Sequence, residues 1–134
     1  MTQTALVVGA SGIIGSATAD LLTRDGWIVH GLARRPVEQT GVHPVPVDLQ
    51  DAEATASALN GLQPDAVFIT TWARQSSEKE NIRVNAGMVR NLLDALRPSG
   101  SVRHVALVTG LKHYLGPFEA VSYTHLRAHE TPEH

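Results

Sequence analysis

The stretch TALVVGASGIIG, residues 4–15, decides the fold. Its first part, residues 4–8, is a short apolar run rich in β-branched residues, which is typical of a strand buried on both faces of a parallel sheet. Three glycines follow, and apolar residues then recur at helical spacing until Gly26 provides a stop. The stretch therefore predicts a strand, a tight turn and a helix in that order. The apolar positions of this helix are Ile13, Ile14, Ala17, Leu21 and Leu22.

The alternation of strands and helices continues up to residue 110. A short helix is expected at residues 51–59, capped by Asp51, and a long amphipathic helix is expected before the sequence RPSG. This alternation predicts the α/β class, with a doubly wound parallel sheet in the order 3-2-1-4-5 that is truncated after about the fifth strand. Strands are expected at residues 27–33, 43–49, 65–71 and 104–110, the last one buried, and the long helix carries a stripe of Ile82, Val89, Leu92, Leu93 and Leu96.

The composition excludes several classes of protein. The 134 residues carry a formal net charge of -2, so no broad attraction to nucleic acid or to an anionic membrane is expected. The absence of cysteine removes disulfides, thiolate zinc sites and thiol catalysis, and no metal site is predicted. No apolar run approaches the roughly 20 residues of a membrane helix, and the N-terminus lacks the pattern of a secretory signal. The cytoplasm is therefore the expected location.

The glycine turn has the properties of a phosphate-binding loop. A strand that turns sharply, a backbone that approaches a pyrophosphate and a helix that packs close to the strand each need a residue without a β-carbon. The N-terminus of the helix then offers unpaired N–H groups and a partial positive charge. The alternative is a tight turn that binds nothing. The residues expected to contact the cofactor here are Gly9, Ser11, Gly12, Ile13, Ile14 and Gly15.

The G-x-x-G-x-x-G spacing resembles that of the extended short-chain dehydrogenases/reductases. An NAD enzyme usually has a carboxylate at the end of the second strand, to hold the ribose 2′-hydroxyl. Here Arg34 and Arg35 occupy that region, and no acid follows until Glu38. Guanidinium groups match the geometry of a phosphate and keep their charge. The pair therefore predicts a preference for NADP(H), unless the two arginines are simply a solvated surface pair.

Further cofactor contacts are expected where the third and fourth strands end. The resemblance implies that Asp48 and Leu49 flank the adenine, although Asp48 is also suited to cap the helix that follows. Thr70, Thr71 and Trp72 should line the cleft, because ligands of open sheets lie outside the carboxyl ends of the strands. Of these three, Thr71 is the one predicted to bind the cofactor.

The string TGLKHYLGPFE, residues 109–119, resembles the signature of the progesterone 5β-reductase/iridoid synthase-like family of atypical extended short-chain reductases. Residues 71–96 and the sequence GLARRP resemble the same family, and the similarity runs from about residue 5 to residue 119. The resemblance implies NADPH-dependent reduction of an activated carbon–carbon double bond beside a carbonyl. It also implies that Lys112 acts with a tyrosine from a later segment, and that Thr109 contacts the nicotinamide.

Asn85 interrupts the apolar stripe of the long helix. It resembles the asparagine that short-chain reductases place near the active site. A buried asparagine that makes structural hydrogen bonds is an equally good account.

Two other functions stay open. A sugar-nucleotide epimerase or dehydratase of the extended branch would need Tyr-x-x-x-Lys, which the chain lacks. A non-catalytic NADP-sensing protein would not need Lys112. Either way the expected partner is a small molecule, and the sequence does not indicate an oligomeric state.

Residues 1–120 are expected to form an incomplete NADP-binding Rossmann domain. Residues 121–134 resemble translated DNA of a sequencing adapter, so they are expected to be a non-native, disordered tail. The chain lacks the partner tyrosine, a sixth strand and a substrate lid, and is therefore expected to be inactive by itself.

Overall fold

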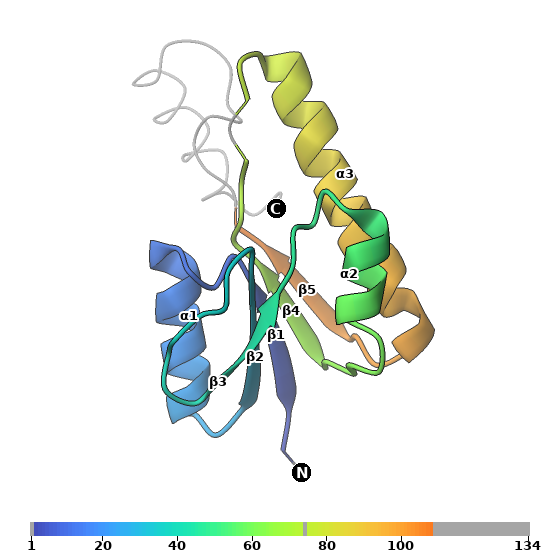
Figure 1. The fold of residues 1–134 in the computed structure, drawn as a ribbon. Helices are drawn as coiled ribbons and strands as arrows, with labels where there is room; N and C mark the ends of the chain where they lie inside the picture. Colours follow the sequence, from blue (N-terminus) through green and yellow to red (C-terminus); the bar gives the residue numbers. More distant parts are fainter. Residues whose placement is uncertain (1, 74, 109–134) are drawn as a thin grey trace, which may run out of the picture.

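Five parallel strands form one sheet in the order β3-β2-β1-β4-β5, as the sequence predicts (Figure 1). The computed structural model describes residues 2–73 and 75–108. The strands are β1 (Thr4–Val8), β2 (Ile28–Ala33), β3 (Val42–Pro46), β4 (Ala66–Ile69) and β5 (His104–Leu107). The helices are α1 (Ile13–Arg24), α2 (Ala52–Ala58) and α3 (Glu78–Leu96), followed by the 3-10 turn η1 (Arg97–Ser99).

Helices cover both faces of the sheet, which makes the fold doubly wound (Figure 1). On one face, α1 packs Ala19 against a cluster of small strand residues that includes Val7 and Val29. On the other face, α3 and α2 cover a larger cluster around Leu6 and Val67. Both clusters are fully shielded at their centres, so β1 is buried on both sides as expected. No helix within the described ranges is long and apolar enough to cross a membrane.

The expectation of a buried fifth strand is wrong for the residues described. All four residues of β5 are exposed, and 59% of the surface of Leu107 is accessible. The reason is position: among the described strands β5 pairs with β4 alone, so it forms an edge of the sheet. An apolar strand sequence indicates a tendency to be covered, but it does not supply the covering element.

The apolar faces of two helices also differ from the prediction. In α1 the buried positions are Gly15 and Ala19, one turn apart, while Ile13, Ile14 and Leu21 are exposed. Small residues allow this helix to approach the sheet closely, so the large apolar side chains lie on its flanks. In α3 the buried residues are Val84, Asn85, Met88, Leu92 and Leu96.

Ile82 and Leu93 belong to a second stripe of α3. Ile82 is 60% exposed and Leu93 is 39% exposed. The predicted stripe is therefore correct for Leu92 and Leu96 and wrong for these two residues. The residues of α3 that face the sheet are Val84, Met88, Leu92 and Leu96, which follow one another at i, i+4 spacing and belong to the core cluster.

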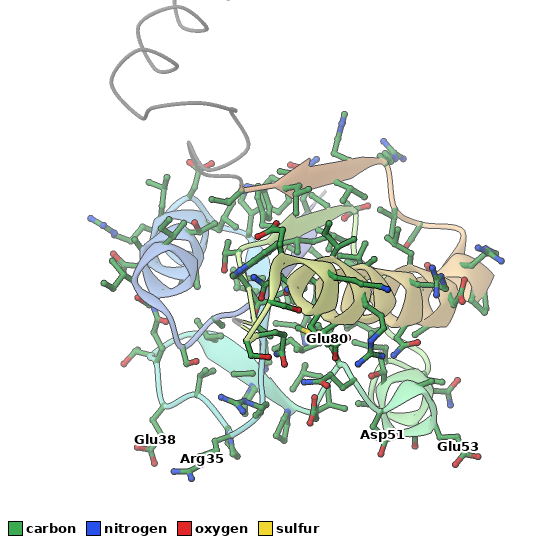
Figure 2. All side chains as sticks on the ribbon, turned by 90° about the horizontal axis from the view of Figure 1, so that it is seen from above. Arg35, Glu38, Asp51, Glu53 and Glu80 are labelled. Atoms are coloured by element: carbon green, nitrogen blue, oxygen red, sulfur yellow. The ribbon has the colours of Figure 1, made fainter. Side chains whose placement is uncertain are left out.

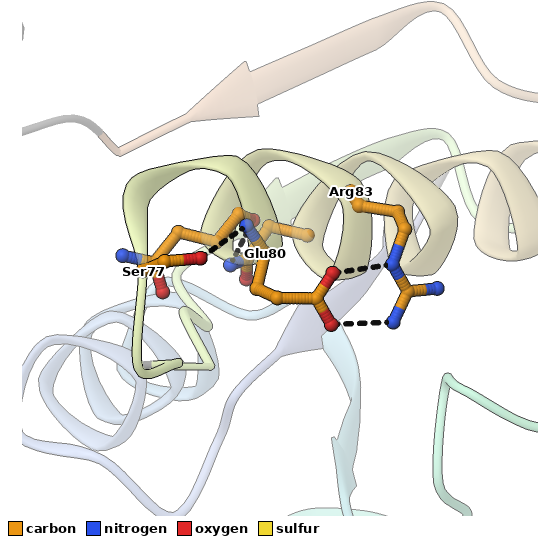
Figure 3. Close-up of polar contacts among 5 residues, drawn as sticks. Ser77, Glu80 and Arg83 are labelled. Atoms are coloured by element: carbon orange, nitrogen blue, oxygen red, sulfur yellow. Dashed lines mark hydrogen bonds and ion pairs between the residues drawn. The ribbon is translucent and has the colours of Figure 1, made fainter.

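Side-chain caps fix where α2 and α3 begin. Asp51 accepts a hydrogen bond from the N–H of Ala54 at 3.0 Å, as the sequence predicts. Ser77 accepts one from the N–H of Glu80, and Arg83 donates two to the same Glu80 carboxylate (Figure 3). The hydrogen bond from Arg83 lowers the pKa of Glu80. Because these groups are exposed, they define where α2 and α3 begin more than they stabilise the fold.

A pair of histidines faces the α2–α3 side of the sheet at adjacent strands. His30 of β2 is directly opposite His43 of β3, and the ring centroids are 5.1 Å apart. Burial, and then the nearby His43, lower the pKa of His30. The folded state therefore binds fewer protons at His30 than the unfolded state does at mildly acidic pH.

This difference predicts how stability depends on pH. The free energy of unfolding should fall as the pH drops below about 6.5, because the unfolded His30 then binds a proton before the folded one. His30→Asn should flatten that fall, as measured by urea denaturation between pH 8 and pH 5. His43→Asn removes the smaller cause and should give an intermediate slope. An unchanged slope in His30→Asn would contradict the assignment.

Candidate functional site

The glycine turn between β1 and α1 is the most tightly packed part of the site. Gly9 has a φ of 88°, which favours glycine, and a β-carbon there would lie 2.8 Å from the Thr70 hydroxyl oxygen. A β-carbon on Gly15 would lie 2.0 Å from the Gly9 carbonyl oxygen. The first glycine therefore makes the turn, and the third lets α1 rest directly on it, as the sequence predicts.

Gly12 is different, because nothing in the described protein requires a glycine there. Its φ is -81°, and a β-carbon would meet only the Gly9 carbonyl oxygen, at an ordinary 3.5 Å. The space beside its α-carbon faces away from the protein's own packing. The described packing therefore gives no reason for a glycine at this position, whereas a ligand close to the backbone would be one.

The N-terminus of α1 is suited to an anion. Gly12 is its N-cap in an extended conformation, and no side chain caps the first N–H groups. The first turn contains no acidic residue. Since the N-terminus of a helix carries unpaired N–H groups and a partial positive charge, this end favours a phosphate. Ile13 and Ile14 lie at this end with their side chains exposed.

Two adjoining cavities run along the carboxyl ends of the strands. One, of about 700 Å³, lies between the glycine turn and the segment after β2, and is lined by Ser11, Arg34 and Arg35. The other, of about 390 Å³, extends past β3 and β4 and is lined by Asp48, Leu49 and Thr71 among others. They meet at Ser11 and Arg34, which line both. The two cavities form one groove across the point where the strand order reverses.

The segment after β2 presents its charges to the groove. Arg34 and Arg35 are exposed, and within the described residues neither forms an ion pair. Glu38 lines the same cavity, and Figure 2 shows Arg35 and Glu38 projecting from the segment that joins β2 to β3. Gln39 donates a hydrogen bond to the Ser16 carbonyl at 3.0 Å and ties this segment to α1. The cavity thus carries a net positive charge.

The segment after β3 is held from two sides. The Asp48 carboxylate accepts a hydrogen bond from the N–H of Gln50, and the Asn91 side chain of α3 donates to the Leu49 carbonyl at 2.7 Å. Since Asp51 is the N-cap of α2, the alternative that Asp48 caps this helix is wrong. Asp48 and Leu49 both line the groove.

Asn85 makes structural hydrogen bonds rather than pointing into the groove. Its side chain accepts from the N–H of Ala73 and donates to the carbonyls of Ala73 and Asn81, each at 2.8 Å. Asn81 in turn accepts from the N–H of Gln75. The two asparagines clamp the segment after β4, whose Trp72 lines the groove. These bonds favour the structural account of Asn85.

An apolar cavity of about 390 Å³ lies next to the groove and was not predicted from the sequence. Ile82, Val89 and Leu107 line it, and it shares Thr71 and Trp72 with the groove. The sequence feature that indicates this cavity is the second apolar stripe of α3. It cannot be recognised without knowing that α3 places this stripe beside β4 and the exposed strand β5.

The predicted site residues fall into three groups. Some line the groove, some shape the turn or lie at the start of α1, and Thr109 and Lys112 lie outside the described residues. Thr70, expected to line the cleft, lines none of these cavities and faces the glycine turn instead. The groove is lined by Gly9, Ser11, Arg34, Arg35, Asp48, Leu49 and Thr71, and the turn and helix start comprise Gly12, Ile13, Ile14 and Gly15.

A family model described as the NAD dependent epimerase/dehydratase family matches residues 5–129. The chain belongs to this family. The match begins in β1 and includes every predicted site residue. The resemblance to extended short-chain reductases is thereby confirmed at the level of the family.

Curated relatives agree with the resemblance to the progesterone 5β-reductase/iridoid synthase-like family. A 3-oxo-Delta(4,5)-steroid 5-beta-reductase of Arabidopsis thaliana is 44% identical over 128 residues, which cover 87% of this chain and 33% of the relative. An (S)-8-oxocitronellyl enol synthase of Camptotheca acuminata is 40% identical over 139 residues, covering 96% and 35%. The chain therefore spans about a third of the length of the curated relatives that it matches.

Solved structures share the fold. A short-chain dehydrogenase/reductase superfamily protein from Agrobacterium tumefaciens with bound NAD is 30% identical, with a TM-score of 0.64, over 78% of this chain and 32% of that one. A short chain dehydrogenase from Burkholderia cenocepacia in complex with NADP has a TM-score of 0.72 at 18% identity, over 97% and 65%. The second likeness shows the fold alone.

Two of the three glycines, Gly12 and Gly15, give a matched pair of variants. Gly12→Ala should leave the free energy of unfolding nearly unchanged and weaken NADPH binding by about tenfold or more, since the methyl group occupies the space that a phosphate would need. Gly15→Ala should instead destabilise the protein by several kcal/mol, because the methyl group meets a backbone carbonyl that cannot move aside. Urea denaturation and NADPH titration separate the two effects. Normal NADPH affinity in a well-folded Gly12→Ala would contradict the phosphate role.

Proposed function

We propose that the protein to which this chain belongs is an NADPH-dependent reductase of an enone or a related carbonyl compound. The observation that carries the proposal is the groove itself. A helix N-terminus without a side-chain cap lies on one side of its larger cavity, and two guanidinium groups without a partner ion among the described residues lie on the other side. Such a pair of positive groups facing one cavity suits a pyrophosphate and a ribose 2′-phosphate.

The end of β2 supports NADP(H) over NAD(H). Ala33 is its last residue, and the carboxylate that would hold a free 2′-hydroxyl is absent from this position. Glu38 is near, but Arg34 and Arg35 outnumber it in the cavity. A charge-assisted hydrogen bond contributes about 1.5–3 kcal/mol, so the pair is sufficient to set the preference.

The reaction is inferred from the relatives and from Lys112. The names of the two curated relatives quoted above denote a reductase of a steroid enone and an enol synthase. The bound nicotinamide would supply the hydride to the β-carbon of such a substrate. Negative charge then develops on the carbonyl oxygen, and the Lys112 ammonium would stabilise it and lower the pKa of a neighbouring tyrosine hydroxyl. Thr109 would contact the nicotinamide from the end of β5.

A second candidate is an epimerase or dehydratase, because the matching family model carries that description. This chemistry would need a Tyr-x-x-x-Lys pair, which residues 1–134 do not contain. For either enzyme we propose a small-molecule substrate, no nucleic-acid or membrane partner and a cytoplasmic location, in line with the net charge of -2. A protein that only senses NADP would use the same groove without Lys112.

The cofactor preference has a direct test. In the full-length protein, Arg34→Ala combined with Arg35→Ala should weaken NADPH about tenfold or more, because the 2′-phosphate loses its charged donors, and should change NADH little. Isothermal titration with both cofactors measures this. Arg24→Ala combined with Arg97→Ala removes the same charge at exposed helix ends and serves as the control. Equal weakening of both cofactors would contradict the 2′-phosphate role.

The chemistry is tested at Lys112. In the full-length protein, Lys112→Ala should lower kcat for enone-dependent NADPH oxidation about a hundredfold or more, the effect of removing one donor to a developing oxyanion. The Kd of NADPH should hardly change. Lys79→Ala, on the exposed start of α3, is the matched control. Full turnover in Lys112→Ala would contradict the proposed role of Lys112, whereas NADPH binding without any enone-dependent oxidation by the unmodified protein would favour the sensing function.

A further inference from the structure

Thr70 contacts the glycine turn from the side opposite to the groove. It follows β4 directly, and its N–H donates to the Val8 carbonyl at 2.9 Å. Its hydroxyl lies 2.7 Å from the same oxygen and 3.3 Å from the Gly9 carbonyl oxygen. The hydroxyl oxygen would also be 2.9 Å from a β-carbon on Gly15. One hydroxyl therefore contacts both the strand end and the turn, and it occupies the space that a side chain at Gly15 would need.

The turn is held between Thr70 and β2. The N–H groups of Gly9 and Ala10 both donate to the Leu32 carbonyl, at 2.9 and 3.0 Å. Each peptide unit is planar, so the carbonyl of Val8 and the N–H of Gly9 point in opposite directions, and the same holds for Gly9 and Ala10. Two consecutive peptide planes are thus fixed at both edges. Their orientation decides where Ser11 and the first N–H groups of α1 point.

The hydroxyl is not needed to pair the strands. The Val8 carbonyl already accepts the N–H of Thr70, which continues the β1–β4 ladder. A valine would have the same shape, suits a parallel strand end at least as well and would keep that backbone bond. What valine would lack is the donor that faces the two carbonyls of the turn. The distinctive contribution of threonine is therefore to the turn rather than to the sheet.

We propose that Thr70 is a positioning residue for the cofactor pyrophosphate and acts through the glycine turn. Thr70 lines neither cavity of the groove, so it does not touch the ligand itself, whereas its neighbour Thr71 lines the groove. The hydroxyl of Thr70 fixes the backbone whose N–H groups receive the phosphates. This inference rests on the proposed function, since it assumes that a dinucleotide occupies the groove.

The test compares two ligands in the full-length protein. NADPH contains the pyrophosphate, whereas adenosine 2′-phosphate lacks any phosphate that reaches the turn. Thr70→Val should weaken NADPH about threefold to tenfold, the effect of one neutral hydrogen bond, and should leave the Kd of adenosine 2′-phosphate unchanged. Thr70→Ser keeps the hydroxyl and should restore NADPH affinity. Should Thr70→Val fold poorly, Thr70→Ala compared with Thr70→Ser isolates the hydroxyl in the same way.

Each outcome is decisive. Unchanged NADPH affinity in Thr70→Val, or in Thr70→Ala relative to Thr70→Ser, would overturn the inference and leave the proposed function intact. Equal weakening of both ligands would show general loosening of the fold and would also overturn it. Failure of the unmodified protein to bind NADPH would overturn the proposed function, and this inference with it.

Discussion

The contact between Gly15 and the Gly9 carbonyl is the constraint on which the rest of the site depends. A single methyl group at Gly15 would lie 2.0 Å from that oxygen, so α1 can start here only by resting on the turn itself. This contact directs the N-terminus of α1 along the carboxyl edge of the sheet. It also brings the turn within reach of Thr70 on one side and Leu32 on the other. Packing within the protein therefore sets the direction of the backbone N–H groups of this turn, before any ligand is present.

The strand order places that backbone where a groove must open. β1 lies between β2 and β4, so the chain leaves β1 toward one face of the sheet, while the helices that follow β3 and β4 lie on the other. No crossover passes over the junction, and the segments after β2, β3 and β4 become its walls. Asn91 and the asparagines near the start of α3 then fix two of those walls by hydrogen bonds to backbone. The groove is therefore a consequence of topology, and its walls are refined by polar side chains.

The sequence predicts this topology well because the signals are local. A buried run ended by glycine, and helices with capping residues, define the element order without reference to tertiary contacts, and Asp51 caps α2 as expected. What it does not predict depends on neighbours far along the chain. Ile82 and Leu107 have the composition of core residues but are exposed, because nothing in the described structure packs on them. Likewise, the sequence places Thr70 at the end of a strand, but only the register of β1 with β4 turns its hydroxyl toward the turn.

In the proposed function, two different kinds of group would carry cofactor binding and cofactor selectivity. The phosphates would be received by backbone N–H groups, whose direction is set by the packing of the glycine turn and by the hydrogen bonds around it. The 2′-phosphate would be received by exposed side chains on a segment that Gln39 ties to α1 by a single hydrogen bond. The two arginines tolerate substitution, because their side chains are exposed and do not support the core. The division explains how one fold can hold either nicotinamide cofactor: the preference changes with two or three exposed residues, while the turn that binds the pyrophosphate keeps its geometry.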